Sequence, residues 1–305
     1  MHSGRAVADR IGPVGVWSFQ FDRMTGADAR RAAARIEQMG AGALWIPESL
    51  VSKELFAHVT LLLAATERLP LVSGIANIWA RDAVAMQNGA RTLAEAFPGR
   101  FILGLGVSHE PVVKRRGQTY EKPLTRMREY LDALDRARYA GPEPAEPAPR
   151  VLAALGPRML RLAAERTAGA HPYFVPVEHT PIARAALGDG PLLAVEQAVV
   201  FETDPLTARE IAKGHMAGYL RLENYANNLK RLGWSEDDIA GPTDRLVDAI
   251  VAWGTSESIF DRIVTHLTHG ADHVCIQAIS RDPAVVTFEP LAEIIREIRS
   301  SNTIV

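Results

Sequence analysis

The sequence alternates short apolar runs with longer amphipathic stretches, and this alternation recurs about eight times along the chain. The apolar runs predict β-strands and the stretches between them predict helices. The predicted strands are residues 14–19, 43–47, 71–76, 101–105, 151–154, 173–175, 192–201 and 273–278. Several of these runs are apolar throughout, as strands covered on both faces are. The pattern therefore predicts repeated βα units around a parallel sheet.

Helix boundaries are indicated by capping residues. The predicted helices are residues 28–39, 54–68, 82–96, 125–139, 158–167, 182–187 and 256–269. Asp82, Thr125 and Ser256 are expected as N-caps. Glycines follow four of the helices, where a left-handed residue ends a helix well: Gly40, Gly99, Gly141 and Gly270.

Eight strand-helix pairs predict a closed (β/α)8 TIM barrel formed as one domain by residues 1–305. An open doubly wound sheet is the competing architecture, because its local βα signals are the same. The count of eight favours the barrel. Residues 206–253 are less regular and contain helical patterns at 206–232 and 243–253. We interpret them as an enlarged helical connection between strands 7 and 8, over one mouth of the barrel or at a subunit contact.

The charge and the cysteine content narrow the possible partners. The formal net charge is −2, which gives no field that would attract nucleic acid or an anionic membrane. No uninterrupted apolar stretch of about 18 residues predicts a membrane-spanning helix. Cys275 is the only cysteine, which excludes an internal disulfide and indicates a reducing compartment, the cytoplasm. No metal-binding motif is present, so we expect small molecules or further copies of the chain as partners.

Polar and small residues follow the predicted strands, at the end of a barrel where active sites form. The polar ones are Glu48, Ser49, Ser73, Asn77 and His109. The small ones are Ser73, Gly74, Gly106, Ala153, Ala154 and Gly156. A flat ring lying across strand ends needs such small residues, although the same residues also occur where a helix crowds a strand. The segment GLGVSH lacks the third glycine of a dinucleotide fingerprint, which argues against a Rossmann fold.

Three segments resemble a known family: MGAGALWIPES, NIWARDAVAMQNGARTLAEAFPGRFILGLGVSHE and VLAALGPRMLRLAAERTAGAHPYFV. Together they resemble the luciferase-like monooxygenase superfamily, and within it the F420-dependent oxidoreductases, over residues 14–279. The resemblance implies a barrel with a cofactor ring at its C-terminal mouth. It also implies a non-proline cis peptide at Ser73–Gly74, which supports that ring, and a homodimer.

By the same resemblance, Glu48 and Ser49 lie beside the ring, and Ala153 and Ala154 lie under it. His109 stands where it faces both cofactor and substrate, and the proton would be carried by His109 or, alternatively, by Glu48. Both Ser49 and His109 depart from a related sugar-phosphate dehydrogenase, which has a histidine and a carboxylate at these places. The proton chemistry of that relative therefore does not transfer directly.

Further candidates surround this centre. The phosphate tail of the cofactor is expected at a helix start formed by His179 and Thr180. The basic run 114–116 follows strand 4 and is placed to attract an acidic tail. Three aromatic residues near strand ends are expected to wall the substrate pocket, or else to belong to the core: Trp17, Phe19 and Trp79.

The resemblance implies hydride transfer between F420 and a small organic substrate. FMN in the same site, in a flavin-dependent monooxygenase, is the alternative. A second alternative is a cofactor-free binding or structural homologue, which the small residues at the strand ends disfavour. The sequence does not identify the substrate or the direction of hydride transfer.

Overall fold

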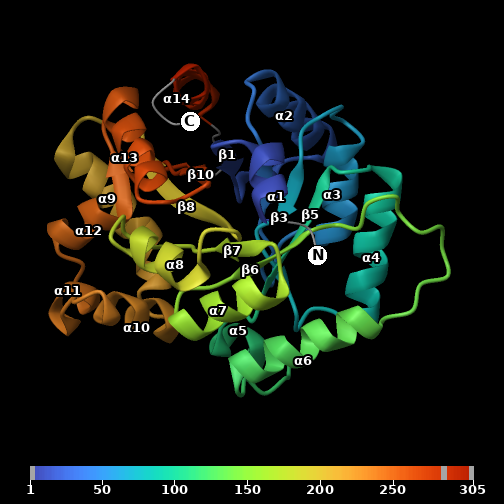
Figure 1. Cartoon of the computed structure of the whole chain (residues 1–305). Helices are drawn as coiled ribbons and strands as arrows, with labels where there is room; N and C mark the ends of the chain where they lie inside the picture. The colour runs from blue at the N-terminus through green and yellow to red at the C-terminus, as the bar shows by residue number, and fades with distance from the viewer. Residues whose placement is uncertain (1–3, 283–286, 302–305) are drawn as a thin grey trace.

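The computed structural model describes residues 4–282 and 287–301. Eight parallel strands close into a barrel in the order β1-β2-β3-β5-β6-β7-β8-β10, because β10 pairs with both β8 and β1. Helices surround this barrel (Figure 1). The predicted TIM barrel is confirmed, and the closed ring of strands excludes an open doubly wound sheet.

The barrel strands are β1 (Val14–Trp17), β2 (Leu44–Ile46), β3 (Leu71–Ser73), β5 (Phe101–Gly106), β6 (Arg150–Ala153), β7 (Gly169–His171), β8 (Leu192–Val200) and β10 (His273–Ala278). Two short strands lie off this path: β4 (Ala76–Asn77) pairs with β5, and β9 (Val251–Trp253) pairs with β8. The strand predicted at 173–175 is wrong, since β7 ends at His171. A strand of glycine, alanine and histidine carries little apolar signal, whereas the loop after it is apolar.

The helices on the barrel's outside are α2 (Gly26–Gln38), α3 (Leu55–Leu63), α4 (Ala83–Ala96), α6 (Pro123–Arg136), α7 (Pro157–Arg166), α8 (His179–Leu187), α13 (Ser256–Thr268) and α14 (Phe288–Ser300). Short additional segments are the 3-10 helix η1 (Gln20–Arg23) and α5 (Glu110–Arg115). Of these helices, η1, α5 and α14 were not predicted.

The expected caps are only partly present. Asp82 accepts hydrogen bonds from the backbone N–H groups of Val84 and Ala85, as an N-cap does. The expectation fails at Thr125, because α6 begins earlier, and at Ser256, where the preceding Thr255 is the cap. Gly40, Gly99 and Gly270 have the positive φ expected after a helix, whereas Gly141 does not.

The N-terminal helix α1 (Gly4–Ile11) closes one end of the barrel. Its Val7 and Ile11 are buried in one cluster with interior side chains such as Trp45 and Cys275. Gly4 packs so tightly that a Cβ there would lie 2.3 Å from the backbone nitrogen of Leu192. The end of the barrel at the carboxyl ends of the strands is therefore the one where a ligand can enter.

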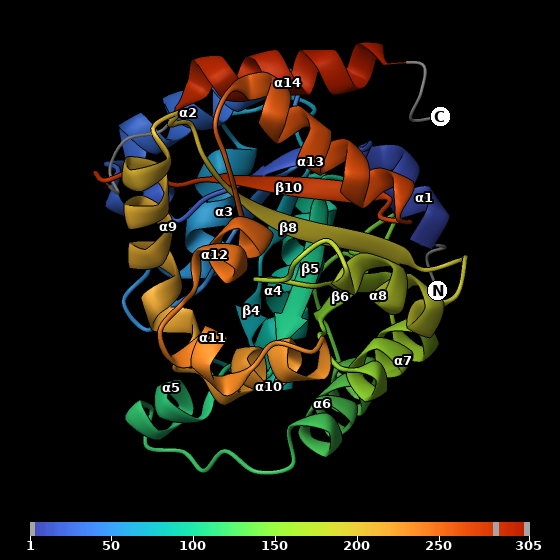
Figure 2. The same ribbon diagram turned by 90° about the vertical axis from the view of Figure 1, so that its left-hand side faces the viewer.

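Between β8 and β10 the chain forms α9 (Pro205–Tyr219), α10 (Glu223–Arg231), α11 (Glu236–Ala240), α12 (Asp244–Ile250) and β9. This helical connection occupies the segment expected at 206–253 and has a hydrophobic cluster of its own. Figure 2 shows α10 beside α5, at the same end of the molecule. Within the described residues, no helix has the length and apolar character needed to cross a membrane.

Four buried histidines make the stability of the fold depend on pH. His58, His171, His266 and His273 are each 3% exposed or less. Burial lowers the pKa of His58, His171 and His273 to about 4 and that of His266 to about 3. Because these values lie below the unfolded pKa of about 6.5, the unfolded chain binds more protons as the pH falls below 6.5.

We therefore expect the free energy of unfolding to fall by several kcal/mol between pH 7 and pH 5, because each of the four histidines contributes at most about 1.4 kcal/mol per pH unit below pH 6.5. Urea denaturation at the two pH values measures it. An unfolding free energy that is equal at both would contradict the neutral, buried state of these side chains.

Candidate active site

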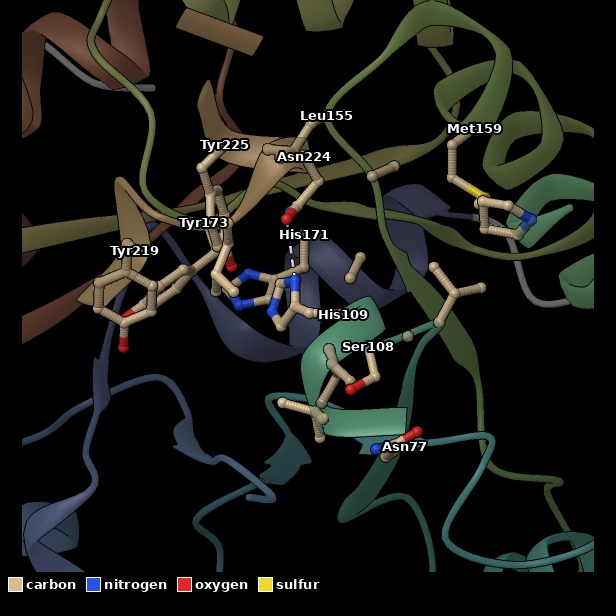
Figure 3. A pocket seen from close by; sticks show the side chains of 18 of the residues that line it. Asn77, Ser108, His109, Leu155, Met159, His171, Tyr173, Tyr219, Asn224 and Tyr225 are labelled. Atoms are coloured by element: carbon tan, nitrogen blue, oxygen red, sulfur yellow. Dashed lines mark hydrogen bonds between the residues drawn. The ribbon is translucent and has the colours of Figure 1, made fainter. Parts of the chain in front are cut away.

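A cavity of about 1090 Å³ opens at the carboxyl ends of the strands. Its wall is formed by the ends of β1 to β7 and by the helical connection. Figure 3 shows several of the side chains that line it, among them Asn77, His109 and His171. The predicted residues that line it are Trp17, Phe19, Glu48, Ser49, Gly74, Asn77, Gly106, His109, Ala153, Ala154 and Gly156. The structure thus brings most of the predicted site to one place.

Ser73, expected at the cofactor ring, does not line the cavity. Its side chain is fully buried, and its Oγ donates to the carbonyl of Gly104 and accepts from the backbone N–H of Gly104. The N–H of Gly74 still pairs with the carbonyl of Ile46. Strand pairing thus continues through Gly74, and the cis peptide lies at Gly74–Ile75, one residue beyond the predicted Ser73–Gly74.

At Gly106 the small residue has a different cause from the one expected. A Cβ on Gly106 would lie 2.4 Å from Cδ1 of Ile75 and 3.4 Å from Cβ of Ala153. Gly106 is therefore small because Ile75 packs over it. Ile75 is half-buried and lines the cavity together with Ala153 and Ala154. These three apolar side chains line the cavity at the strand ends, and we call them the shelf.

His109 lies in the cavity wall at the start of α5. Its Nδ1 is 2.9 Å from Oδ1 of Asn224, a residue of α10 (Figure 3). Since an amide oxygen only accepts, Nδ1 carries the proton and Nε2 carries the lone pair. Burial lowers the pKa of His109 below its usual 6.5, although the bond to Asn224 opposes this. The side chain is therefore neutral at pH 7, with a ring nitrogen able to accept a proton.

Glu48 lines the cavity, and its carboxyl group is bound by other parts of the protein. Its side chain is 5% exposed, and Arg81 binds both oxygens, at 2.5 Å and 3.0 Å. The backbone N–H of Asn77 also donates to Glu48 Oε2, at 2.7 Å. Two charge-assisted hydrogen bonds and one from the backbone therefore occupy the oxygens of Glu48. The structure therefore favours His109 over Glu48 for proton transfer.

The pair formed by Glu48 and Arg81 is expected to stabilise the loop that carries Asn77. Replacing Arg81 by Leu leaves the Glu48 carboxylate buried without its partner, which should lower the unfolding free energy by about 1–3 kcal/mol. The matched control is Arg31→Leu, which removes an exposed ion pair with Asp28 and should cost less than about 1 kcal/mol. Thermal and urea unfolding measure both. Equal losses in the two variants would contradict a structural role for the buried pair.

The prediction that the helix start at His179 and Thr180 binds a phosphate tail is wrong. His179 and Thr180 are 1% and 0% exposed, and neither lines the cavity. His179 Nε2 contacts the carbonyl of Leu155 at 2.9 Å, and Thr180 Oγ1 contacts Nδ1 of His266 at 2.7 Å. Both side chains are buried away from the cavity, so they cannot face a ligand there.

A different helix start does face the cavity. Gly156 is the N-cap of α7, and it lines the cavity with the first residues of that helix. Basic side chains border the same space: Arg115, Lys122, Arg158 and Arg231. Among the described residues, no carboxylate forms an ion pair with any of these four. We call them the basic rim. A helix N-terminus and unpaired cations favour an anionic ligand group here.

Aromatic side chains close the opposite part of the cavity. Trp17 packs edge-on against Phe19, with ring centroids 4.7 Å apart, and lies 5.0 Å from Tyr173. Tyr219 and Tyr225 come from the helical connection. Trp79 is not part of this wall. Its Nε1 donates to the carbonyl of Val107, and Arg126 lies over its ring outside the cavity.

Several functional candidates were not predicted from the sequence. They are Ile75, Arg81, Lys122, Arg158, His171, Tyr173, Tyr219, Asn224, Tyr225 and Arg231. His171 stands directly at the end of β7, so a correctly placed strand would have identified it. Asn224 lies in a helix of ordinary composition and had no local signal.

Comparison with known proteins agrees with this geometry. Residues 13–273 match the family model described as luciferase-like monooxygenase. The chain therefore belongs to the luciferase-like monooxygenase family, which confirms the predicted resemblance and the interpretation of the chain as an enzyme.

Two relatives are 5,10-methylenetetrahydromethanopterin reductases. The one from Archaeoglobus fulgidus is 24% identical over 263 residues, covering 80% of this chain and 70% of the relative. The one from Methanolobus tindarius is 29% identical over 149 residues, covering 44% of this chain. That match spans 46% of the relative, or about half its length.

Solved structures share the fold over almost the whole chain. An F420-dependent secondary alcohol dehydrogenase in complex with an F420-acetone adduct superimposes with a TM-score of 0.77 at 15% identity, covering 94% of this chain and 99% of that one. The coenzyme F420 dependent tetrahydromethanopterin reductase from Methanopyrus kandleri gives a TM-score of 0.72 at 16% identity, with the same coverage. A type II Baeyer-Villiger monooxygenase component from Pseudomonas putida, in complex with FMN, gives 0.66 at 15% identity and covers 95% of this chain and 97% of that one.

Proposed function

We propose that the chain is an F420-dependent oxidoreductase that transfers a hydride between the deazaflavin and a small organic substrate. The observation that carries the proposal is that the shelf and His109 face one cavity. A platform for a flat ring and a neutral proton acceptor are the two things that hydride transfer to or from a carbon bearing oxygen needs from the protein.

The residues present fit such a cofactor. Ile75, Ala153 and Ala154 offer apolar contact to a ring without filling the cavity. The N-terminus of α7 and the basic rim suit a phosphate and further acidic groups of a tail. When bound, the deazaflavin supplies the hydride chemistry, and the protein supplies orientation and a proton.

In this proposal His109 moves the proton. Asn224 fixes the tautomer, so that Nε2 accepts a proton from a substrate hydroxyl during oxidation or, once protonated, returns it to the oxygen during reduction. Trp17, Phe19 and Tyr173 exclude water from the apolar part of the cavity. Glu48 and Arg81 hold the chain beside the shelf.

The basic rim favours F420 over FMN. Both cofactors carry a phosphate, but the longer acidic tail of F420 makes better use of four unpaired cations. An FMN-dependent monooxygenase is the second candidate, because the shelf accepts either ring. A cofactor-free homologue is the third, and the same experiment separates all three.

The test is single-turnover hydride transfer under anaerobic conditions. Protein loaded with reduced F420 is mixed with a panel of small ketones and aldehydes, and protein loaded with oxidised F420 with the matching alcohols. We expect at least one pair to change the deazaflavin absorbance faster than a protein-free control. The same panel with reduced FMN and oxygen tests the second candidate, and no reaction with either cofactor would defeat the proposal.

A homodimer and a cytoplasmic location belong to the same proposal, by the resemblance and the single cysteine. Light scattering of the purified protein measures the first, and a mass equal to one chain would contradict it.

A further inference from the structure

His171 combines burial with an unused polar atom. It ends β7, is 2% exposed, and stacks on Trp45 with ring centroids 4.4 Å apart. Its Nδ1 lies 2.9 Å from the carbonyl oxygen of Ala194. A carbonyl oxygen only accepts, so Nδ1 carries the proton and Nε2 carries a lone pair.

The lone pair of His171 Nε2 has no hydrogen-bond partner among the described residues. The neighbouring polar groups are committed elsewhere: the Tyr173 hydroxyl lies 2.8 Å from that of Tyr219 and 2.9 Å from Gln277 Oε1. Cys275 Sγ approaches Nδ1 of His171, at 3.9 Å, and not Nε2. The residue nevertheless lines the cavity, as Figure 3 shows.

Other buried polar atoms without a partner belong to residues away from the cavity: His58, Asn88, Arg116, His179, Glu196 and Asn228. Among these buried atoms without a partner, His171 Nε2 is the one whose residue lines the cavity. Buried acceptors in folded proteins are normally paired, and because His171 lines the cavity, a ligand bound there can supply the missing partner of Nε2.

We propose that His171 Nε2 forms a hydrogen-bond-acceptor subsite in the cavity, which binds an O–H or N–H group of the ligand and discriminates against ligands that place a carbonyl or ether oxygen there. The inference rests on the proposed function, because it assumes that cofactor and substrate occupy this cavity. The donor group belongs to the cofactor ring or to the substrate, and the experiment distinguishes the two sources. In either case His171 determines specificity and does not carry the reacting proton.

Two variants separate the two roles of the imidazole, which are the donor to the Ala194 carbonyl and the acceptor at Nε2. In His171→Asn, the amide retains a donor for the Ala194 carbonyl but has no acceptor at the position of Nε2. In His171→Gln, the longer side chain restores an acceptor oxygen near that position. A residue that only packs on Trp45 would respond to both changes alike, whereas a ligand acceptor is lost in the first and recovered in the second.

The first arm titrates F420, and in parallel FMN, into wild-type protein and both variants. The second arm titrates phenol and anisole into the F420-loaded proteins, or into FMN-loaded proteins if only FMN binds, since the two probes share a ring and differ in the donor. If the cofactor is the source, His171→Asn weakens cofactor binding about tenfold and His171→Gln recovers most of it. If the substrate is the source, wild-type protein binds phenol about tenfold more tightly than anisole, and His171→Asn abolishes the difference.

A measurement on wild-type protein covers the case in which a variant does not fold. With ¹⁵N-labelled histidine, the unprotonated Nε2 resonance of His171 should move upfield when the cofactor or phenol binds. Cofactor affinity and phenol preference unchanged in folded His171→Asn, or an unmoved resonance, would overturn the subsite alone. Wild-type protein that binds neither F420 nor FMN would overturn the proposed function, and the subsite with it.

Discussion

Replacing Ala153 by Leu is expected to weaken F420 binding at least about 100-fold, which corresponds to about 2.7 kcal/mol of binding free energy. Ala153 is half-buried at the end of β6, and its methyl group lines the cavity beside Ile75 and Gly106. The additional carbons have no room in the strand layer and must extend over the shelf. They would occupy the space of the ring rather than strain the core.

The control for this variant is Ala217→Leu, on the exposed face of α9, which adds the same atoms away from the cavity. Both variants should keep the wild-type unfolding midpoint within a few degrees. Fluorescence titration measures the F420 dissociation constants. If Ala153→Leu binds F420 as tightly as Ala217→Leu, no ring lies on the shelf.

Replacing His109 by Gln is expected to slow single-turnover hydride transfer by about 10²- to 10⁴-fold, the usual contribution of a positioned proton-transfer group. F420 affinity should change less than about threefold, because an amide still fills the position beside Asn224. His269→Gln, an exposed histidine at the end of α13, is the matched control and should react at the wild-type rate. An unchanged rate in His109→Gln would remove this residue from the chemistry.

The pH dependence of the oxidation direction gives the same test a second readout. The neutral imidazole is the active form, and burial lowers the pKa of His109 from 6.5. The rate should therefore be flat above pH 6.5 and should fall at lower pH, as the ring becomes protonated. Since the bond to Asn224 favours the charged form, Asn224→Leu should move this acid limb to still lower pH. An acid limb at the same pH in Asn224→Leu as in the wild-type protein would contradict the assignment of His109 as the proton acceptor.

The barrel was predictable because its signal is local. Strands such as β8 and β10 are mostly apolar and are buried along their whole length, as strands covered on both faces are. The prediction of strand β7 failed for the opposite reason. Gly169 lies so close to Leu192 that a Cβ on Gly169 would come within 2.0 Å of the carbonyl oxygen of Leu192. Close backbone contact selects small residues there, and a run of small residues resembles a loop.

The site was predictable only where position along a strand determines it. Residues at or shortly after the ends of strands, such as Ala153 and His109, do line the cavity. Contacts between distant segments left no trace in the sequence: Asn224 reaches His109 across 115 residues, and Arg81 reaches Glu48 across 33. The prediction of a phosphate site at His179 failed because a helix start that faces the core and one that faces a ligand have the same sequence pattern.

The most direct test of the account is a parallel titration of purified protein with F420 and with FMN, followed by fluorescence. The account predicts saturable, stoichiometric binding of F420 that is tighter than that of FMN, weakened by added salt because the basic rim contributes. Saturable binding of neither cofactor would contradict the redox function, and tighter binding of FMN would contradict the assignment to F420.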